Sequence, residues 1–308
     1  MDADLADAGI AITPDESRRV LAEPSPLAAF WAAFRENRGA MLGLTVLSLV
    51  VLAAIFADFI APHSPIEQFR DAVRAKPVWA GGTWRFPFGT DGDGRDMLSI
   101  LIYGGRVSLF IGVSVMSVSF VVGVALGLIA AMGGTIADVA ITRVMDLIMA
   151  VPSLVLAILV VAILGPSLAN TIVAVTIVYT PRYVRLVRAS ALGELNKDYV
   201  TAARTAGVGR LRLALSTILP NCLAPLIVQA ALGVSDAILE AAGLGFLGLG
   251  AQPPTPEWGA ALADSREFIR SDPWIVALPG LAILITVVAI NLTGDGLRDA
   301  LDPKMRRS

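Results

Sequence analysis

The strongest constraint on this sequence is the length of its uncharged apolar runs. Residues 107–131 carry no charged side chain, and residues 147–181 form a longer run that is also free of charge. A helix needs about 20 mostly apolar residues to cross the hydrocarbon core of a bilayer. Only 16% of all residues are charged, against about 25% in an ordinary soluble domain. The sequence therefore predicts an integral membrane protein.

Six helical spans account for the apolar runs. Residues 147–181 are too many for one ordinary span, and Gly165, Pro166 and Ser167 form a helix-breaking cluster, so we divide this run in two. Pro152 is expected to kink the third span, because a proline removes one backbone hydrogen bond. The predicted fold is all-α and polytopic, with six transmembrane helices. Its predicted segments are spans at 41–61, 107–131, 145–164, 168–187, 222–248 and 274–294, outer loops at 62–106 and 249–273, a cytoplasmic loop at 188–221, and cytoplasmic tails at 1–40 and 295–308.

The distribution of positive charge indicates how the chain sits in the membrane. With the N-terminus inside, sixteen of the 24 lysines and arginines fall on inner segments and eight on outer segments. Short inner loops of membrane proteins carry an excess of Lys and Arg. The sequence thus predicts that both termini are cytoplasmic (N-in, C-in), and this count assigns Arg182, Arg185 and Arg188 to the inner side.

The tail before the first span contains an amphipathic segment. Leu27, Phe30, Trp31 and Phe34 recur at helical spacing, with Arg35 beside them. This pattern is typical of a helix that lies on the inner membrane surface. The alternative is that these residues begin the first span.

Residue counts exclude several kinds of catalytic and metal site. Cys222 and His63 are the only cysteine and histidine, so an intrachain disulfide, a Cys-based zinc cluster and an HExxH metal site are all impossible. The sequence has no GxxxxGK[ST] loop for binding ATP. A net charge of −2 argues against nucleic acid as a partner. We expect a non-catalytic chain with no cofactor or metal of its own.

The cytoplasmic loop at 188–221 is the largest polar feature between two spans. Asp198 is expected to cap a short helix at 199–206, and Gly207 suits the position just after a helix end, where a positive φ is common. A second helix at 210–219 is expected to stop at Pro220. The loop would then form a helix–glycine–helix elbow suited to docking, although a solvated linker fits the same pattern.

This loop resembles the EAA loop of bacterial ABC-importer permeases, in which Glu-Ala-Ala precedes a glycine and a later Leu-Pro. The matching residues are Ala202, Ala203, Gly207, Leu219 and Pro220, and Thr201 stands where the family has Glu. Segments at 88–109, 143–154, 185–207, 219–233, 243–259 and 291–304 are similar to the peptide/nickel permease family, and most of all to C-type subunits of dipeptide permeases. The resemblance implies the architecture of a type I ABC-importer permease.

The resemblance also implies a larger machine. In this family the subunit pairs with a homologous B-type permease subunit in the lipid bilayer of the bacterial inner (cytoplasmic) membrane. Two ABC ATPase subunits bind ATP and Mg, and an extracytoplasmic binding protein delivers the solute. The implied cargo is a di- or oligopeptide, with nickel, glutathione or another small solute as the alternative within the same family.

Three groups of site residues follow from this family resemblance and from the chemistry of the predicted spans. The predicted ATPase-coupling residues are Asp198, Tyr199, Thr201, Ala202, Ala203, Arg204, Gly207, Leu219 and Pro220. The predicted residues of the translocation path are Asp236, Glu240 and Asn291, and those for docking of a binding protein are Glu257, Trp258 and Asp264.

Asp236 and Glu240 are charged residues four apart within a predicted span. A charge at the bilayer centre costs about 2.5–3.5 kcal/mol on insertion scales, so both should face a pore or a partner helix. Lining the path, where they would meet the positive end of a peptide, is one interpretation. A polar contact within the permease dimer, or burial in the neutral form, is the other.

The outer sequence from Asp91 to Asp96 superficially resembles a calcium loop. An EF-hand needs an oxygen ligand at its fifth position and Glu at its twelfth, and here these positions hold Arg95 and Ile102. The family resemblance implies a structural turn instead, in which Arg95 is expected to pair with Asp96.

Two other classes of protein fit the sequence less well than an importer subunit. A secondary transporter would carry ion-coupling groups in broken helices or inverted repeats. An intramembrane enzyme would need a paired catalytic site, and the single histidine, His63, lies outside the predicted spans. The sequence favours the importer subunit over both.

Overall fold

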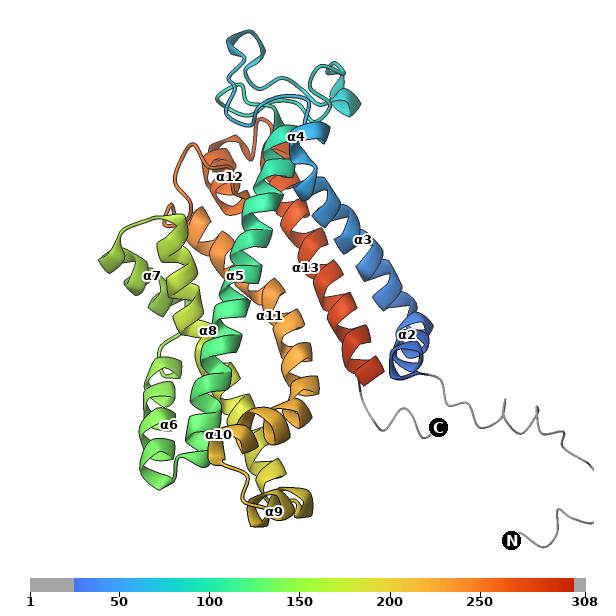
Figure 1. Ribbon diagram of the computed structural model, residues 1–308. Coiled ribbons are helices and arrows are strands. Elements are labelled where there is room, and N and C mark those ends of the chain that lie inside the picture. The colour runs from blue at the N-terminus through green and yellow to red at the C-terminus, as the bar shows by residue number, and fades with distance from the viewer. Residues whose placement is uncertain (1–24, 302–308) are drawn as a thin grey trace, which may run out of the picture.

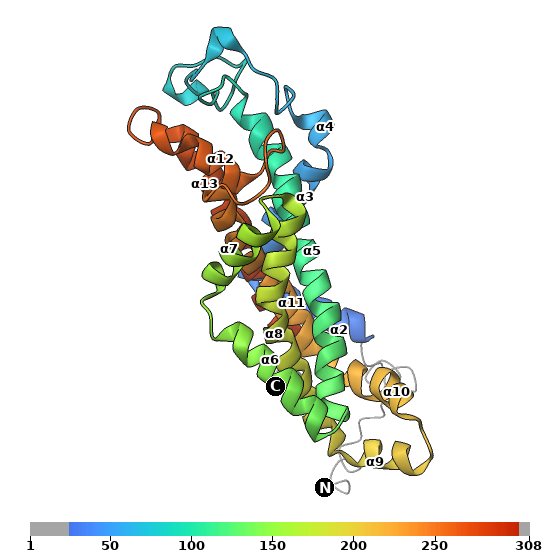
Figure 2. The same ribbon diagram turned by 90° about the vertical axis from the view of Figure 1, so that its left-hand side faces the viewer.

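The structure, a computed structural model, describes residues 25–301, and every regular element in that range is helical. The long helices form an elongated bundle (Figures 1 and 2). They are α3 (Arg38–Ile55), α5 (Met97–Met132), α6 (Thr135–Met149), α7 (Ser153–Leu164), α8 (Leu168–Leu195), α11 (Leu219–Phe246) and α13 (Pro273–Leu301). Shorter helices are α2 (Pro26–Glu36), α4 (Ala57–Ile60), α9 (Asp198–Thr205), α10 (Arg210–Arg212) and α12 (Trp258–Ser265), with 3₁₀ turns at Arg70–Ala72, Val78–Ala80 and Arg266–Phe268. Parts of both predicted tails, 1–24 and 302–308, lie outside the described residues.

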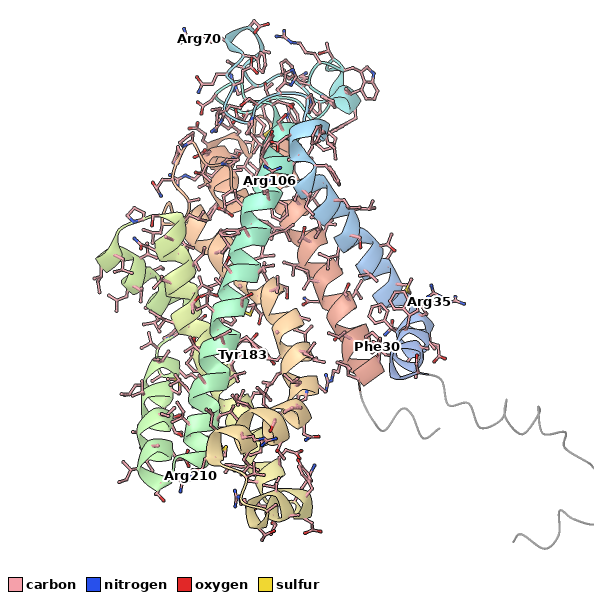
Figure 3. All side chains as sticks on the ribbon, viewed as in Figure 1. Phe30, Arg35, Arg70, Arg106, Tyr183 and Arg210 are labelled. Atoms are coloured by element: carbon pink, nitrogen blue, oxygen red, sulfur yellow. The ribbon has the colours of Figure 1, made fainter. Side chains whose placement is uncertain are left out.

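Polar structure gathers at the two ends of the bundle. The loop between α4 and α5 forms a cap at one end, beside α12, and α9 and α10 project from the other. Arg70 in the cap and Arg210 beside the elbow mark these opposite ends (Figure 3). The molecule therefore separates two candidate docking regions by the length of its long helices.

Four of the described helices are long and apolar enough to cross a membrane. They are α3, α5, the continuous helix Arg210–Phe246 and α13, and a fifth span results if α6 and α7 together count as one. Helix α8 is not among them because Arg182, Arg185 and Arg188 occupy its second half. The chain is thus a multi-pass membrane protein, and the count of six spans stays a prediction.

The segment predicted as the third span is broken. Helix α6 ends at Met149, α7 begins at Ser153, and the two meet at 93° (Figure 2). Pro152 stands at the N-cap of α7, with an extended ψ of 134°. A proline cannot donate to the preceding turn and crowds it sterically, so the helix ends before the proline instead of bending through it.

Small residues let α5 and α8 pack closely at the centre of the bundle. A Cβ built on Gly123 would lie 2.2 Å from Cβ of Tyr183, and one on Gly127 would lie 2.6 Å from Cβ of Val187. Tyr183 is fully buried, lies among the long helices (Figure 3), and its hydroxyl donates to the carbonyl of Gln229 at 3.2 Å. The four-residue spacing of the two glycines is typical of such a close helix contact.

The second helix of the predicted elbow does not stop at Pro220. Helix α10 passes into a π-helical segment, Leu213–Ile218, which continues directly into α11. Pro220 has no N–H to bond to the preceding turn. The wider π-helical turns accommodate the proline without ending the helix, so the elbow is joined rigidly to the long helix that follows it.

Helix α2 is amphipathic, as predicted, but only part of its apolar side is buried. Phe34 is buried against α13, where a Cβ on Gly296 would lie 3.1 Å from its ring, whereas Leu27 is exposed. The Trp31 ring stacks on Phe34 at 5.7 Å, and Arg35 lies over Trp31 at 5.0 Å. Part of α2 therefore packs on the bundle, and its exposed part is free to meet a membrane surface.

Candidate functional site

The elbow begins at α9, which is tied to the end of α8 by three side chains. The Glu194 carboxylate accepts from the Lys197 ammonium at 2.8 Å and from the Tyr199 hydroxyl. The hydrogen bond to Glu194 raises the pKa of Tyr199 to about 12, and the bond from Lys197 lowers the pKa of Glu194. Lys197 occupies the N-cap and Asp198 the first turn, so Asp198 interacts with the helix dipole and is not the cap that the sequence predicted.

Helix α9 ends in a C-terminal cap that contains Gly207. The N–H of Gly207 donates to the carbonyl of Arg204, and the N–H of Val208 donates to the carbonyl of Ala203. Gly207 has a φ of +80°, and a Cβ there would meet nothing within 4 Å. This is the hydrogen-bond pattern of a Schellman cap. The glycine is therefore required by the backbone conformation and not by close packing, and its predicted positive φ is confirmed.

The elbow presents one face to the protein and one face outward. Val200 is fully buried in a cluster with Leu213, Ile218 and Cys222, and Ala203 packs against the same cluster. The remaining predicted coupling residues differ in their exposure. Thr201, Ala202, Arg204, Gly207 and Pro220 are exposed, and Leu219 is partly buried. The buried side fixes the elbow in place, and the exposed side is available to another subunit.

Asp236 lies near the middle of the bundle and is paired with an arginine. The Arg182 guanidinium of α8 donates to Asp236 of α11 at 3.1 Å and lies 4.9 Å from the centre of the Tyr179 ring. Glu240 follows Asp236 by one helical turn on α11. Arg182 was not predicted as a site residue, because the charge count placed it on the inner side although it falls within the predicted span at 168–187. The arginine spacing along a helix that continues to Leu195 was the available signal.

Asn291, the third predicted residue of the path, lies on a different contact. Its amide oxygen accepts a hydrogen bond from the Ser235 hydroxyl at 2.6 Å, which joins α13 to α11. Ser235 is buried and points away from the neighbouring Asp236, which pairs with α8. The structure thus brings Asp236 and Glu240 together and places Asn291 in a separate helix–helix contact.

Two further ion pairs connect α6 to the second half of α8. Arg185 donates to Asp146 at 2.5 Å, and Arg188 donates to Asp138 at 2.5 and 2.6 Å. Successive arginines of α8 are therefore paired with carboxylates from two different helices. Because α8 leads directly to α9, these pairs fix the elbow relative to α6 as well as to α11.

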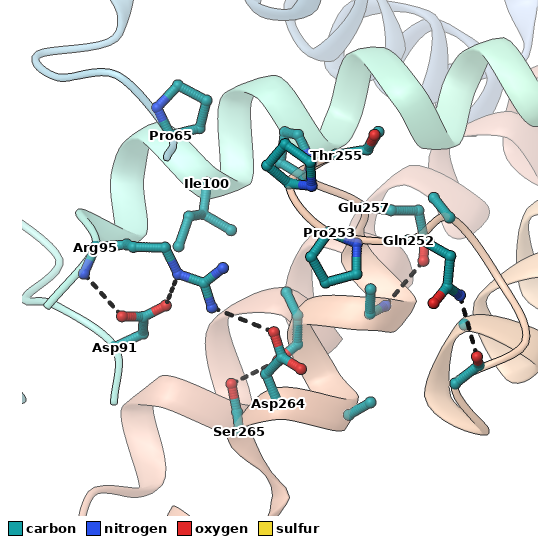
Figure 4. Close-up of a pocket in the computed structure, with 18 of the residues that line it drawn as sticks. Pro65, Asp91, Arg95, Ile100, Gln252, Pro253, Thr255, Glu257, Asp264 and Ser265 are labelled. Atoms are coloured by element: carbon teal, nitrogen blue, oxygen red, sulfur yellow. Dashed lines mark hydrogen bonds and ion pairs between the residues drawn. The ribbon is translucent and has the colours of Figure 1, made fainter. Parts of the chain in front are cut away.

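The cap at the other end contains a cavity of about 230 Å³ with Arg95 on its wall (Figure 4). The Arg95 guanidinium donates to Asp91 at 2.6 Å and to Asp264 at 3.2 Å, and it lies 3.3 Å from Asp93. Asp96 instead caps α5 and bonds to Ser99. The expected pairing of Arg95 with Asp96 was wrong, because the helix start uses the Asp96 carboxylate.

The residues predicted to dock a binding protein differ in their access to solvent. Glu257 and Trp258 are each 2% exposed. The Glu257 carboxylate accepts from the N–H groups of Gly259 and Ala260, both at 2.8 Å, and burial raises the pKa of this carboxyl. Asp264 is at the surface and bonded to Arg95. Glu257 and Trp258 thus pack against α5 and α11, and docking at this end stays a prediction.

Replacing Arg95 with Gln is expected to loosen the cap. Burial already raises the pKa of Asp91, and without Arg95 its ionised form loses its only cation contact among the described residues. We expect chymotrypsin to cleave the loop at 62–96 at least about tenfold faster at neutral pH, the scale of a lost charged hydrogen bond. The difference in cleavage rate between the variant and the wild type should narrow as the pH falls and Asp91 becomes protonated. A carboxyl whose pKa is raised in the folded state lowers stability only where it is ionised in the unfolded state, so this cost disappears at low pH.

Arg85→Gln is the control for this digestion. Arg85 lies in the same loop and donates to Asp71 at 2.9 Å, but both side chains are more than half exposed. Exposed pairs contribute little to stability. Equal digestion of the Arg95 and Arg85 variants would contradict the assigned role of Arg95.

Comparison with known proteins identifies the family of this chain. Residues 123–307 match the family described as binding-protein-dependent transport system inner membrane component, and residues 25–77 match the N-terminal transmembrane domain of oligopeptide transport permease C. The chain is 56% identical over 289 residues to a di/tripeptide transport system permease protein of Pseudomonas aeruginosa, covering 94% of this chain and 95% of that protein. It is 55% identical over 284 residues to the dipeptide transport system permease protein of Escherichia coli K12, covering 92% and 95%.

Solved structures show the same fold at lower sequence similarity. An inward-facing structure of the MetNI methionine ABC transporter superposes with a TM-score of 0.54 at 19% identity, covering 67% of this chain and 98% of that one. The all-helical bundle is thus that of an ABC-importer permease. The chain belongs to the family of binding-protein-dependent transport system inner membrane components, and its resemblance to the peptide permeases is confirmed.

Proposed function

We propose that this chain is the C-type membrane subunit of a dipeptide importer in the bacterial inner membrane. The coupling role rests on the elbow, where the side containing Val200 is anchored in the protein and the side containing Thr201, Ala202 and Arg204 is exposed. The cargo is inferred from relatives named as dipeptide and di/tripeptide permeases. Nickel, glutathione or another small solute is the alternative cargo.

The proposed importer has several other subunits. A homologous B-type permease completes the membrane part, two ABC ATPases bind ATP and Mg, and an extracytoplasmic binding protein delivers the peptide. This chain contributes no catalysis. In the proposed arrangement six spans cross the membrane with both termini in the cytoplasm, the elbow at α9 contacts an ATPase, and the cap beside α12 faces the binding protein.

Coupling in this proposal is mechanical. When the ATPases close on ATP, they move the elbow, and α9 passes that movement to α8 through Glu194 and to α11 through the unbroken π-helical joint. Both helices hold the charged residues near the middle of the bundle. A rigid element biased at one end can switch a gate at the other.

Uptake in cells tests the cargo. Cells that lack this gene are complemented with the wild-type chain, and uptake of a labelled dipeptide is measured beside uptake of nickel as a control. We expect dipeptide uptake to depend on the gene and nickel uptake not to depend on it. Dipeptide uptake that is unchanged by the deletion would overturn the proposed cargo, and gene-dependent nickel uptake would support the alternative.

A stand-alone secondary transporter would behave differently in the same cells. It would not need the ATPase subunits, whereas the proposed subunit depends on them. Deleting the genes of the proposed ATPase subunits should therefore abolish dipeptide uptake as completely as deleting this gene.

A further inference from the structure

Opposite charges meet near the middle of the bundle on a face that is open in this chain. Arg182 is near the centre of α8, and its guanidinium is 3.1 Å from the carboxylate of Asp236 on α11. Neither partner is buried, because 48% and 45% of the two side chains are exposed. A charge in contact with lipid at this depth costs about 2.5–3.5 kcal/mol on insertion scales. This face therefore borders water or a partner subunit.

Glu240 makes the cluster more than a simple ion pair. It lies one helical turn from Asp236, and its Oε1 is buried without a hydrogen-bond partner among the described residues. A buried carboxylate oxygen without a partner is costly. Two carboxylates thus share one nearby guanidinium, and the cluster has unused capacity to accept hydrogen bonds from a cation.

We propose that Arg182, Asp236 and Glu240 bind the two charged ends of a zwitterionic dipeptide as it crosses the membrane. The inference rests on the proposed function and deepens it by assigning the group that recognises each end. The planar Arg182 guanidinium suits a carboxylate, to which it can donate two parallel hydrogen bonds. The peptide ammonium, with three donors, is taken by Asp236 and Glu240.

An exchange of partners explains why the ion pair is half-exposed. When the peptide enters, Arg182 releases Asp236 and takes the peptide carboxylate, and Asp236 takes the ammonium. Each charge keeps an opposite charge throughout, so neither the site nor the peptide is left with an unpaired ion in a low-dielectric region. The cation–π contact with Tyr179, whose ring centre is 4.9 Å away, holds Arg182 in place during the exchange.

The test measures uptake of alanylalanine by the complete importer, with its partner subunits and binding protein, in proteoliposomes. The variants are Arg182→Gln, Asp236→Asn and the double substitution. Arg106→Gln is the control, because Arg106 on α5 pairs with Asp58 at the same distance of 3.1 Å, with exposures of 41% and 61%, and lies far from the elbow (Figure 3). Binding-protein-stimulated ATP hydrolysis is measured in parallel to verify assembly and coupling.

We expect each single substitution to lower uptake by at least about tenfold, the scale of a lost charged hydrogen bond. Stimulated ATP hydrolysis should persist, and Arg106→Gln should transport normally. The double variant should be at least as impaired as the worse single variant, because the peptide carboxylate then lacks Arg182 and the ammonium keeps only Glu240. Arg182→Lys keeps the charge but loses the planar guanidinium, so it should transport at an intermediate rate. It replaces Arg182→Gln in the test if that variant does not assemble.

A purely structural ion pair gives the opposite result. Removing both members of the pair leaves neither Arg182 nor Asp236 behind without its partner, so the double variant would then recover most of the wild-type uptake. Such recovery, or normal uptake by both single variants, overturns the site while the proposed cargo stands. If the wild-type importer does not transport alanylalanine at all, the proposed function fails and the site fails with it.

Discussion

Replacing Gly123 with Leu is expected to prevent the chain from folding into a stable membrane subunit. A Cβ at this position would lie 2.2 Å from Cβ of Tyr183 and 3.3 Å from two atoms of the Tyr183 backbone. A flexible side chain could rotate away, but a backbone atom can move only with its helix. The cost should exceed the roughly 1–3 kcal/mol typical of overpacking, since α5 and α8 must separate.

Separation of α5 from α8 would also disrupt other contacts. Tyr183 is fully buried, and its hydroxyl bonds to the carbonyl of Gln229 on α11. Phe120 meets the Tyr183 ring edge-on at 6.3 Å. A displaced Tyr183 therefore loosens three helices at once. The loss should appear as a smaller amount of protein in the membrane, no single size-exclusion peak in detergent, and a lower unfolding midpoint.

Gly193→Leu is the control for this prediction. Gly193 is also a helical glycine, on α8, and a Cβ there would meet nothing within 4 Å. Leu has a better helix propensity than Gly, so this variant should accumulate at least as well as the wild type. If the Gly123 and Gly193 variants were equally stable, the close α5–α8 contact would not be what holds the bundle together.

Local sequence signals predicted several of these features because each depends on a short stretch of chain. The spacing of Gly123 and Gly127 indicated a close helix contact, and the position of Gly207 after a short helix indicated a positive φ. Both are confirmed, at an α5–α8 contact and at a φ of +80°. The apolar runs predicted a helical membrane protein for the same reason, since an uncharged helix is stable in lipid without help from distant residues.

Features that depend on tertiary contacts were not predictable in the same way. The sequence indicated a kink at Pro152, but the 93° break also depends on how α6 packs against α8 through Asp138 and Arg188. Arg182 was counted among the inner charges, and its position beside Asp236 depends on how α8 packs against α11. Glu257 and Trp258 lie in a predicted outer loop, yet the fold buries both.

Gly207→Val is expected to uncouple ATP hydrolysis from transport. Valine is branched at Cβ and strongly disfavours the left-handed region, where Gly207 has a φ of +80°. Leaving that region breaks the two hydrogen bonds that close α9, from Gly207 to Arg204 and from Val208 to Ala203. The chain would then leave α9 in a different direction, while the buried Val200 keeps the helix itself in its cluster.

The same substitution two residues later separates backbone strain from added bulk. Gly209 has an ordinary φ of −64°, and a Cβ there also meets nothing within 4 Å. A left-handed conformation costs a non-glycine residue roughly 1–2 kcal/mol, and more for a branched one, which corresponds to about tenfold in a coupled step. We therefore expect dipeptide uptake in cells to fall at least about tenfold for Gly207→Val at normal membrane levels, and to stay near the wild-type rate for Gly209→Val. Equal uptake by the two variants would mean that coupling does not depend on the conformation of the elbow, because only the backbone angle distinguishes the two glycines.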